Sequence, residues 1–419
     1  MPNKRLDYPG LKGSLIQTKQ FKTVQLQLRF FTAIDKSQIT KRSLLASMMR
    51  VQTQRYPSRL AMGQAQDDLY SVSLNTQVSL LGAKHVMTVS LRFAHPRFIG
   101  SSYAEELLAF LNEVLWAPSF TQKSLDEEKA FLKDYIESII TQKGRYAYKR
   151  FSEELLGDQP YYCDAYGSLD DLESISLSDI ENAYDAMMHS DAVYLSLIGD
   201  VDGWFDENRI LKALNLKPRS ASFDRLIMHP IVSPKAPVYD VQDVMQERLY
   251  LAYSLPVYAD DAHHYVALVL NQILGEDSDS LLFKTVRETH GLAYSVGSSF
   301  ISSWGLLIIS LGISYDNTTQ ALQLIDSCLK VLQNGDFETT QLAMAKQNLK
   351  NSIWMASDSA SVVAQRALRE HLMGLNADIE STFKAIDAVQ HDDVVSLAQS
   401  LSNIFHYTLG GHKDEKTHL

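Results

Sequence analysis

Apolar and polar residues alternate along parts of the first half of the chain, in the pattern of strands with one buried face. A first strand is predicted over 24–31. The stretch 71–80 and the row formed by Met87, Val89, Leu91 and Phe93 predict two more, joined at Gly82, so an antiparallel hairpin is their simplest pairing. An apolar run over 192–200 predicts the strand that closes this half.

Between these strands the apolar positions follow the helical period. Over 37–53, Leu44, Leu45, Met48 and Met49 fall on one face, and Tyr56-Pro57-Ser58 follows as a stop signal. Four further helices are predicted in this half, over 59–68, 103–116, 125–148 and 177–188.

A similar order of elements recurs after a stretch rich in proline and serine. The predicted strands of this second half span 248–254, 292–300, 306–313 and 404–409. The predicted helices span 262–274, 280–289, 318–332, 338–355 and 360–373, with shorter ones near Phe383 and Val394. We therefore expect an α+β fold of two similar domains, each a mostly antiparallel sheet with helices packed on one face. The predicted boundaries are 1–216 for the first domain, 217–239 for a linker and 240–419 for the second domain.

Composition narrows the class of function. The 419 residues are 45% hydrophobic and 21% charged, as expected for globular domains, and the formal net charge of −11 argues against a nucleic-acid partner. Cys163 and Cys328 are too far apart and too few for a disulfide framework or a cysteine-ligated zinc site. Neither a signal-peptide core nor an apolar run of membrane-span length occurs, so we expect a cytoplasmic protein without a membrane span.

The stretch 279–296 carries the candidate chemistry. It begins as a helix that ends near Arg287 and passes through Gly291, which can take the positive φ of a helix stop, into a strand that contains Tyr294. A guanidinium and a phenol on one wall can hold a peptide carbonyl. Spacing alone favours a structural interpretation, in which Arg287 is a partner of the helix dipole and Tyr294 a half-buried sheet residue.

This stretch, Val-Arg-Glu-Thr-His-Gly-Leu-Ala-Tyr-Ser-Val, resembles the Arg/Tyr motif of pitrilysin/insulinase-family metallopeptidases, in the branch similar to mitochondrial processing peptidase. The resemblance implies that Arg287 and Tyr294 bind the backbone of a peptide opposite a zinc ion. It also implies a clamshell arrangement of the two domains.

The zinc motif of that family is missing. Active members carry His-x-x-Glu-His on the first helix, which gives two metal ligands and a general base. The resemblance places Ser43 and Ser47 at the histidine positions and Ala46 at the glutamate position, and none of the three supports that chemistry. On the helix that carries the third ligand, Glu128 matches an upstream glutamate and Tyr135 the ligand position, with Asp134 or Glu137 as alternatives in register.

The remaining histidines show no second ligand at a persuasive spacing, and no nucleophile elbow, phosphate loop or dinucleotide fingerprint occurs. We therefore expect no metal, no cofactor and no catalytic residue in this chain. The leading hypothesis is a non-catalytic, peptide-binding subunit, inactive alone, of a heterodimeric zinc peptidase. Its homologous partner chain would carry the zinc.

Two alternatives stay open. The chain is a structural or peptide-binding protein of the same fold with no role in proteolysis, or it is a self-sufficient hydrolase with an unrecognised site. Sequence supplies neither the peptide nor the identity of the partner.

Overall fold

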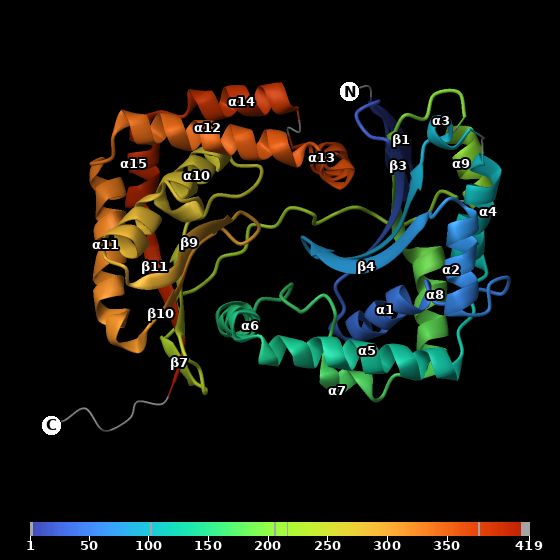
Figure 1. The fold of residues 1–419 in the computed structure, drawn as a ribbon, viewed down its shortest axis with the longest axis horizontal. Helices are drawn as coiled ribbons and strands as arrows, with labels where there is room; N and C mark the ends of the chain where they lie inside the picture. Colours follow the sequence, from blue (N-terminus) through green and yellow to red (C-terminus); the bar gives the residue numbers. More distant parts are fainter. Residues whose placement is uncertain (1–2, 101–102, 205–206, 216, 376–377, 412–419) are drawn as a thin grey trace. The chain divides into compact units, whose positions relative to one another are not determined.

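The computed structural model describes residues 3–100, 103–204, 207–215, 217–375 and 378–411. The chain forms two compact units, and each unit combines three segments of sequence. Unit 1 comprises Met1–Ser138, Cys163–Leu226 and Ala356–Ala377, and unit 2 comprises Ile139–Tyr162, Ile227–Met355 and Asp378–Leu419. Figure 1 follows the elements along the sequence by colour.

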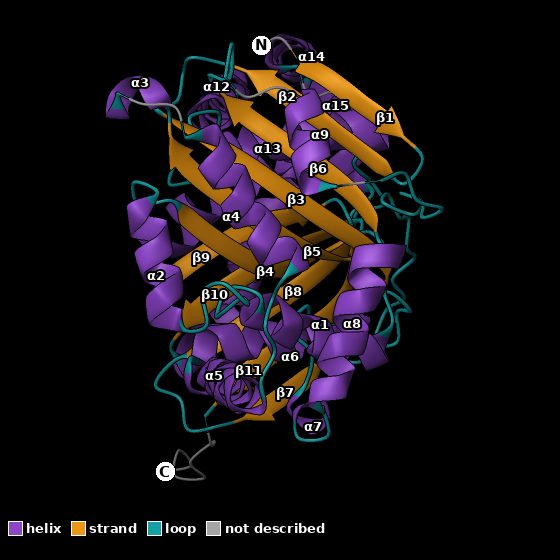
Figure 2. Cartoon of the chain, turned by 90° about the vertical axis from the view of Figure 1, so that its right-hand side faces the viewer, coloured by secondary structure: helices purple, strands orange, loops and turns teal. Residues whose placement is uncertain are grey.

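Unit 1 contains a six-stranded sheet in the order β1-β2-β6-β3-β5-β4. Its strands are β1 (Asn3–Tyr8), β2 (Leu11–Gln17), β3 (Thr23–Ala33), β4 (Ser73–Leu81), β5 (Lys84–Ala94) and β6 (Ala192–Gly199). The pairing of β2 with β6 is parallel and the other four pairings are antiparallel. The long strands β3, β5 and β4 lie side by side (Figure 2), so the sheet is mixed but mostly antiparallel.

Alternate residues of β3 face two different layers. Val24, Leu26, Leu28 and Phe30 belong to the main core of unit 1, which α1, α4 and α8 complete on that face of the sheet. Phe31 belongs to a smaller cluster on the opposite face, where α13 packs against β2 and β6. The helices of this unit are α1 (Lys36–Met48), α2 (Arg59–Asp68), α3 (Pro96–Ile99), α4 (Ala104–Trp116), most of α5 (Gln122–Thr141), α7 (Leu169–Leu172), α8 (Leu177–Ser190), α9 (Glu207–Leu214) and α13 (Ala360–Met373).

Unit 2 contains a five-stranded sheet in the order β7-β11-β8-β10-β9. Its strands are β7 (Val238–Val241), β8 (Glu247–Ser254), β9 (Ala293–Ile301), β10 (Leu306–Ile313) and β11 (Ser402–Gly410). Only the pairing of β7 with β11 is parallel. Strand β9 is therefore an edge strand of this sheet.

Helices cover both faces of the second sheet. One face carries a core completed by α10, α11 and α15. On the other face Phe151 of α6 stacks between Tyr250 and Phe405, with ring centroids 5.2 and 5.7 Å away. The helical elements of this unit are α6 (Lys143–Leu156), α10 (His264–Asn271), the π-helices η1 (Gln272–Glu276) and η2 (Phe283–Thr289), the 3₁₀ turn η3 (Tyr315–Asn317), α11 (Thr318–Asn334), α12 (Thr339–Ala356), α14 (Ile379–Ala388) and α15 (His391–Gln399).

The predicted α+β class with two sheet-and-helix layers is confirmed, and in addition each sheet carries one helix on its second face. The largest differences in extent concern two of the predicted helices. The helix predicted over 37–53 ends at Met48, and Thr53 instead forms an isolated bridge with Pro118. The helix predicted over 125–148 is two helices, since Gln142 takes a non-helical ψ of 86°.

The domain boundaries near 216 and 240 stay a prediction, and residue 216 itself lies outside the described residues. Each compact unit takes in one helix, α6 or α13, from the other half of the sequence. Periodicity identifies a helix without showing which sheet it covers, so sequence order alone does not give this division.

Candidate functional site

Helix α1 holds the three positions where the family's zinc motif was expected. Asp35 begins the helix as its N-cap, accepting a hydrogen bond from the Ser37 N–H at 3.0 Å. Within the helix Ser43 and Ala46 are 6% and 3% exposed. The Ser47 hydroxyl donates to the Leu44 carbonyl at 2.9 Å. These side chains present neither an imidazole nor a carboxylate to a metal ion.

A buried polar network ties α1 to the sheet of unit 1. Arg42 pairs with Asp191 at 2.7 Å and donates through Nε to His85 Nδ1 at 3.1 Å. The His85 Nε2 then donates to the Ala165 carbonyl at 3.0 Å. Burial lowers the pKa of His85 to about 4, so the ring is neutral at pH 7. The network satisfies its own hydrogen bonds and has a structural role.

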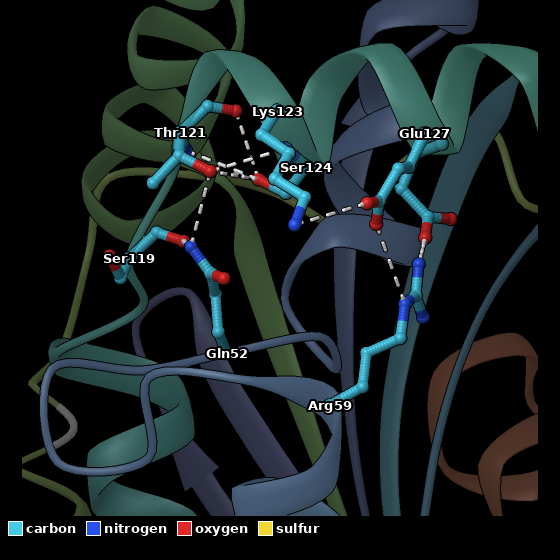
Figure 3. A network of polar contacts seen from close by, with 8 residues as sticks. Gln52, Arg59, Ser119, Thr121, Lys123, Ser124 and Glu127 are labelled. Carbon is cyan, nitrogen blue, oxygen red and sulfur yellow. Dashed lines mark hydrogen bonds and ion pairs between the residues drawn. The ribbon is translucent and has the colours of Figure 1, made fainter.

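Carboxylates on α5 form ion pairs with side chains of the same chain. Glu128 is buried and accepts a hydrogen bond from the guanidinium of Arg59, a residue of α2. The Nε atom of Arg59 lies 3.8 Å from a carboxylate oxygen of Glu127. Figure 3 shows Arg59 and Glu127 near the start of α5, where Lys123 Nζ lies 4.0 Å from Glu127 Oε1. The Thr121 hydroxyl accepts from the Ser124 N–H in the same view. Glu128 therefore joins α5 to α2.

The other predicted third-ligand positions lie further along α5. Tyr135 is partly buried, with its ring 5.0 Å from that of Tyr166. Asp134 and Glu137 are exposed, and Glu137 lies 3.9 Å from Lys133. Across the residues that the structure describes, no group of three His, Cys, Asp or Glu side chains is placed to hold a metal ion.

The second predicted site begins on the π-helix η2 of unit 2. Ser280 Oγ accepts from the Phe283 N–H at 3.4 Å at the start of this turn. At its end Gly291 has the predicted positive φ, +64°, and its N–H donates to the Arg287 carbonyl at 3.1 Å. Helix and strand are thus joined by a glycine stop, as the sequence indicates. The π geometry was not predicted, and such turns are frequent at functional sites.

Arg287 is exposed at the end of this helix. Its guanidinium lies over the ring of Phe283, 4.8 Å from the centroid. Within the described part of the chain it forms no ion pair and no hydrogen bond through its side chain. The guanidinium is therefore positioned by a ring contact, and its donors remain available to a ligand.

Tyr294 owes its exposure to a β-bulge. Val296 and Phe300 pack against the core of unit 2, and strict alternation would place Tyr294 on that same face. The register of β9 against β10 shifts at this point, so that Ala293 occupies the core instead, 7% exposed. Tyr294 is consequently 65% exposed. A bulge that re-aims one side chain is common beside binding sites.

The loop between the two π-helices is held by one carboxylate. Asp277 accepts hydrogen bonds from the side-chain amides of Gln272 and Asn348 at 2.5 and 2.8 Å and from the Asp279 N–H at 2.9 Å. A small pocket lies beside it, with Gln272, Asp277 and Asn348 among its polar lining residues and Ile273, Met344 and Ala345 among its apolar ones. Gly275 approaches the backbone of β9 so closely that an added Cβ would lie 2.6 Å from the Ser298 nitrogen. The loop is thus fixed against the strand that carries Tyr294.

None of the described helices is long and apolar enough to cross a membrane. The predicted cytoplasmic location stays a prediction.

Residues 174–349 match the family described as "Peptidase M16 inactive domain". The chain is 27% identical over 410 residues to the "Probable inactive metalloprotease YmfF" of Bacillus subtilis (strain 168), and the aligned residues cover 96% of each chain. A solved structure of a conserved protein from Enterococcus faecalis superposes with a TM-score of 0.90 at 25% identity and covers 99% of this chain and 100% of that one. The peptidase M16 inactive domain from Pseudomonas fluorescens has the same fold, with a TM-score of 0.82 at 19% identity and 99% of both chains covered. The chain is therefore similar, from one end nearly to the other, to M16-type proteins described as inactive.

Proposed function

We propose that this chain is the non-catalytic, peptide-binding subunit of a two-chain zinc peptidase. The observation that carries the proposal is a contrast between two sites. The helix where the family's zinc motif is expected has serine and alanine at the three motif positions. The Arg/Tyr pair in the other unit is exposed, and its polar groups form no hydrogen bond and no ion pair within the described residues.

In this proposal Arg287 and Tyr294 donate hydrogen bonds to carbonyl oxygens of an extended peptide. The guanidinium and the phenol hydroxyl are both donors, and neither must first break a bond to another described residue. Because η2 and the bulge fix their backbones, little conformational freedom is lost on binding. A homologous partner chain with His-x-x-Glu-His supplies the zinc and the general base, so proteolysis needs both chains.

The proposal is tested by reconstitution. This chain and the zinc-motif homologue from the same genome are purified separately and mixed. Sedimentation velocity measures complex formation, and a pool of fluorogenic peptides measures cleavage with and without chelator. We expect a stable complex, with activity in the mixture alone and its loss on chelation.

Two outcomes would count against the proposal. If the zinc-motif chain is fully active alone and this chain changes neither its rate nor its sedimentation, the heterodimer is wrong. If a complex forms and cleaves, but substitutions at Arg287 and Tyr294 leave the rate unchanged, the alternative of a structural subunit with no role in peptide binding is favoured.

A further inference from the structure

A third polar side chain reaches the bulge that exposes Tyr294. Arg248 starts on β8, two strands away from β9, and stands in register with Gly312 of β10, which in turn faces Ser295. The Arg248 Nη1 donates to Ser295 Oγ at 3.3 Å. The guanidinium therefore crosses the middle strand and ends beside the residue that follows Tyr294.

Gly312 makes this crossing possible. A Cβ at this position would lie 2.5 Å from the Arg248 Nη1 and 2.9 Å from Ser295 Oγ, well inside van der Waals contact. Any larger residue would displace the guanidinium from the surface of the sheet. The glycine thus provides space for a cation at the bulge, and the backbone does not require it, since Gly312 does not have a positive φ.

The charge of Arg248 lacks a carboxylate partner in the described residues. Its hydrogen bond to Ser295 uses one of five guanidinium donors, and no ion pair involves it. The adjacent acid, Glu247, is buried and accepts hydrogen bonds from the hydroxyls of Tyr239 and Thr318. Two residues along β8, Tyr250 faces the same side, and its ring packs against Phe151. A half-buried guanidinium without a carboxylate partner can bind an anion.

We propose that Arg248 is a further peptide-contacting residue of this site and that it binds a carboxylate of the peptide. This inference rests on the proposed function, in which Arg287 and Tyr294 hold the peptide backbone. The Arg248 fork adds selectivity for a negative charge placed next to Tyr294. An acidic side chain and a free C-terminus present the same group, and the experiment separates them.

The test measures binding by the full-length chain with fluorescence anisotropy. The probes are fluorescein-labelled extended octapeptides of Ala, Ser, Thr and Val in which one central position is Asp or Asn. Each peptide is made with a free and with an amidated C-terminus. We expect the Asp peptide or the free-acid peptide to bind at least about tenfold more tightly than its neutral counterpart. Whichever substitution carries the gain identifies the source of the carboxylate.

Variants assign that gain to Arg248. Arg248→Gln and Gly312→Ala should each abolish the preference for the charged peptide. Lys330→Gln, which removes an exposed cation on α11 of the same unit, should change nothing. Circular dichroism melting checks that Gly312→Ala folds, and Arg248→Gln supplies the answer if it does not.

The outcomes separate this inference from the proposed function. If all peptides bind with equal affinity and Arg287→Ala weakens them while Arg248→Gln does not, peptide binding stands and the carboxylate site is wrong. If no peptide of the set binds at millimolar concentration, both proposals fall. A charge preference that survives in Arg248→Gln also overturns the role of Arg248.

Discussion

The arginines of this protein differ in whether another side chain compensates their charge. Arg42 is buried, and both a carboxylate and an imidazole compensate it. Arg287 and Arg248 have no carboxylate partner within the described residues. Burying an unpaired charge is costly, so the interior pairs its cations, while surface cations without partners are available to ligands. The Arg42 network can therefore be tested through stability, and Arg287 and Arg248 through peptide binding.

The neutral, buried His85 predicts acid sensitivity of unit 1. Its pKa is about 4 in the folded chain, against an ordinary value of 6.5. The unfolded chain therefore binds a proton first as the pH falls. This histidine's contribution is complete above about pH 6.5 and is lost progressively toward pH 4, by roughly 3 kcal/mol in total. Urea denaturation at a series of pH values measures it.

His85→Gln is the matched variant, because an amide can accept from Arg42 and donate to Ala165 without titrating. We expect its stability to change less between pH 6.5 and 4 than that of the wild type. Equal slopes in the two proteins would show that another group causes the acid sensitivity.

At Arg287 and Tyr294 the effect should appear in turnover by the reconstituted complex. Arg287→Ala removes a charged hydrogen bond of about 1.5–3 kcal/mol, so the rate should fall about ten- to a hundredfold. Tyr294→Phe keeps the ring, and its smaller effect should not add fully to the first if both groups hold one stretch of peptide. Initial rates over a range of peptide concentrations give kcat and KM separately.

Folding has to be measured beside turnover. Arg287 is exposed and forms no ion pair within the described residues, so its loss should shift the melting temperature little. If both variants melt several degrees lower while their folded fraction cleaves at the wild-type rate, the two residues are structural.

At the scale of elements, the packing around α1 leaves little room for the side chains of the zinc motif. Ser43 and Ala46 lie in a close-packed interface, and the helix is fixed by the Arg42 network beneath it. The triple variant S43H/A46E/S47H restores the motif, but it places two larger polar side chains in that interface. We expect a loss of about 1–3 kcal/mol in stability for each overpacked position and no stoichiometric zinc.

Metal analysis after dialysis, together with thermal melting, checks this expectation. The wild-type chain serves as the reference and should also hold no stoichiometric zinc at this helix. One tightly bound zinc per chain in the triple variant would mean that a third ligand, such as Asp134 or Glu137, is within reach.

Regular helices and strands could be predicted from the sequence, whereas the irregular turns at the site could not. Helix 59–68 and strand 306–313 were predicted with the observed bounds because their apolar periods are regular and their ends are marked. Strand β1 was not predicted, since only Leu6 of its six residues is buried. The bulge at Tyr294 depends on the pairing of β9 with β10, and the π-helices η1 and η2 depend on packing against β9. No local pattern encodes either feature.

For the whole molecule, the important feature is that each compact unit includes a helix from the other half of the sequence. Helix α6 covers Phe405 and Tyr407 on the second sheet, and α13 covers Tyr194 and Ile198 on the first. The predicted domains 1–216 and 240–419 would each lack one of these helices, although each keeps its main core. Whether the halves fold alone is therefore a direct test of how the chain divides.

We expect neither half to be stable when expressed alone, since each leaves an aromatic or aliphatic sheet face uncovered. For the second half, loss of α6 removes the buried Phe151, a change that costs about 3–5 kcal/mol even as a single substitution to alanine. A fusion of residues 139–162 to 227–419 restores that helix and should melt cooperatively at a higher temperature than 240–419. Phe151→Ala in the fusion is the matched control and should cancel most of the gain. Soluble, cooperatively folding 240–419 without α6 would show that the helix is dispensable and that the boundary near 240 is a true domain boundary.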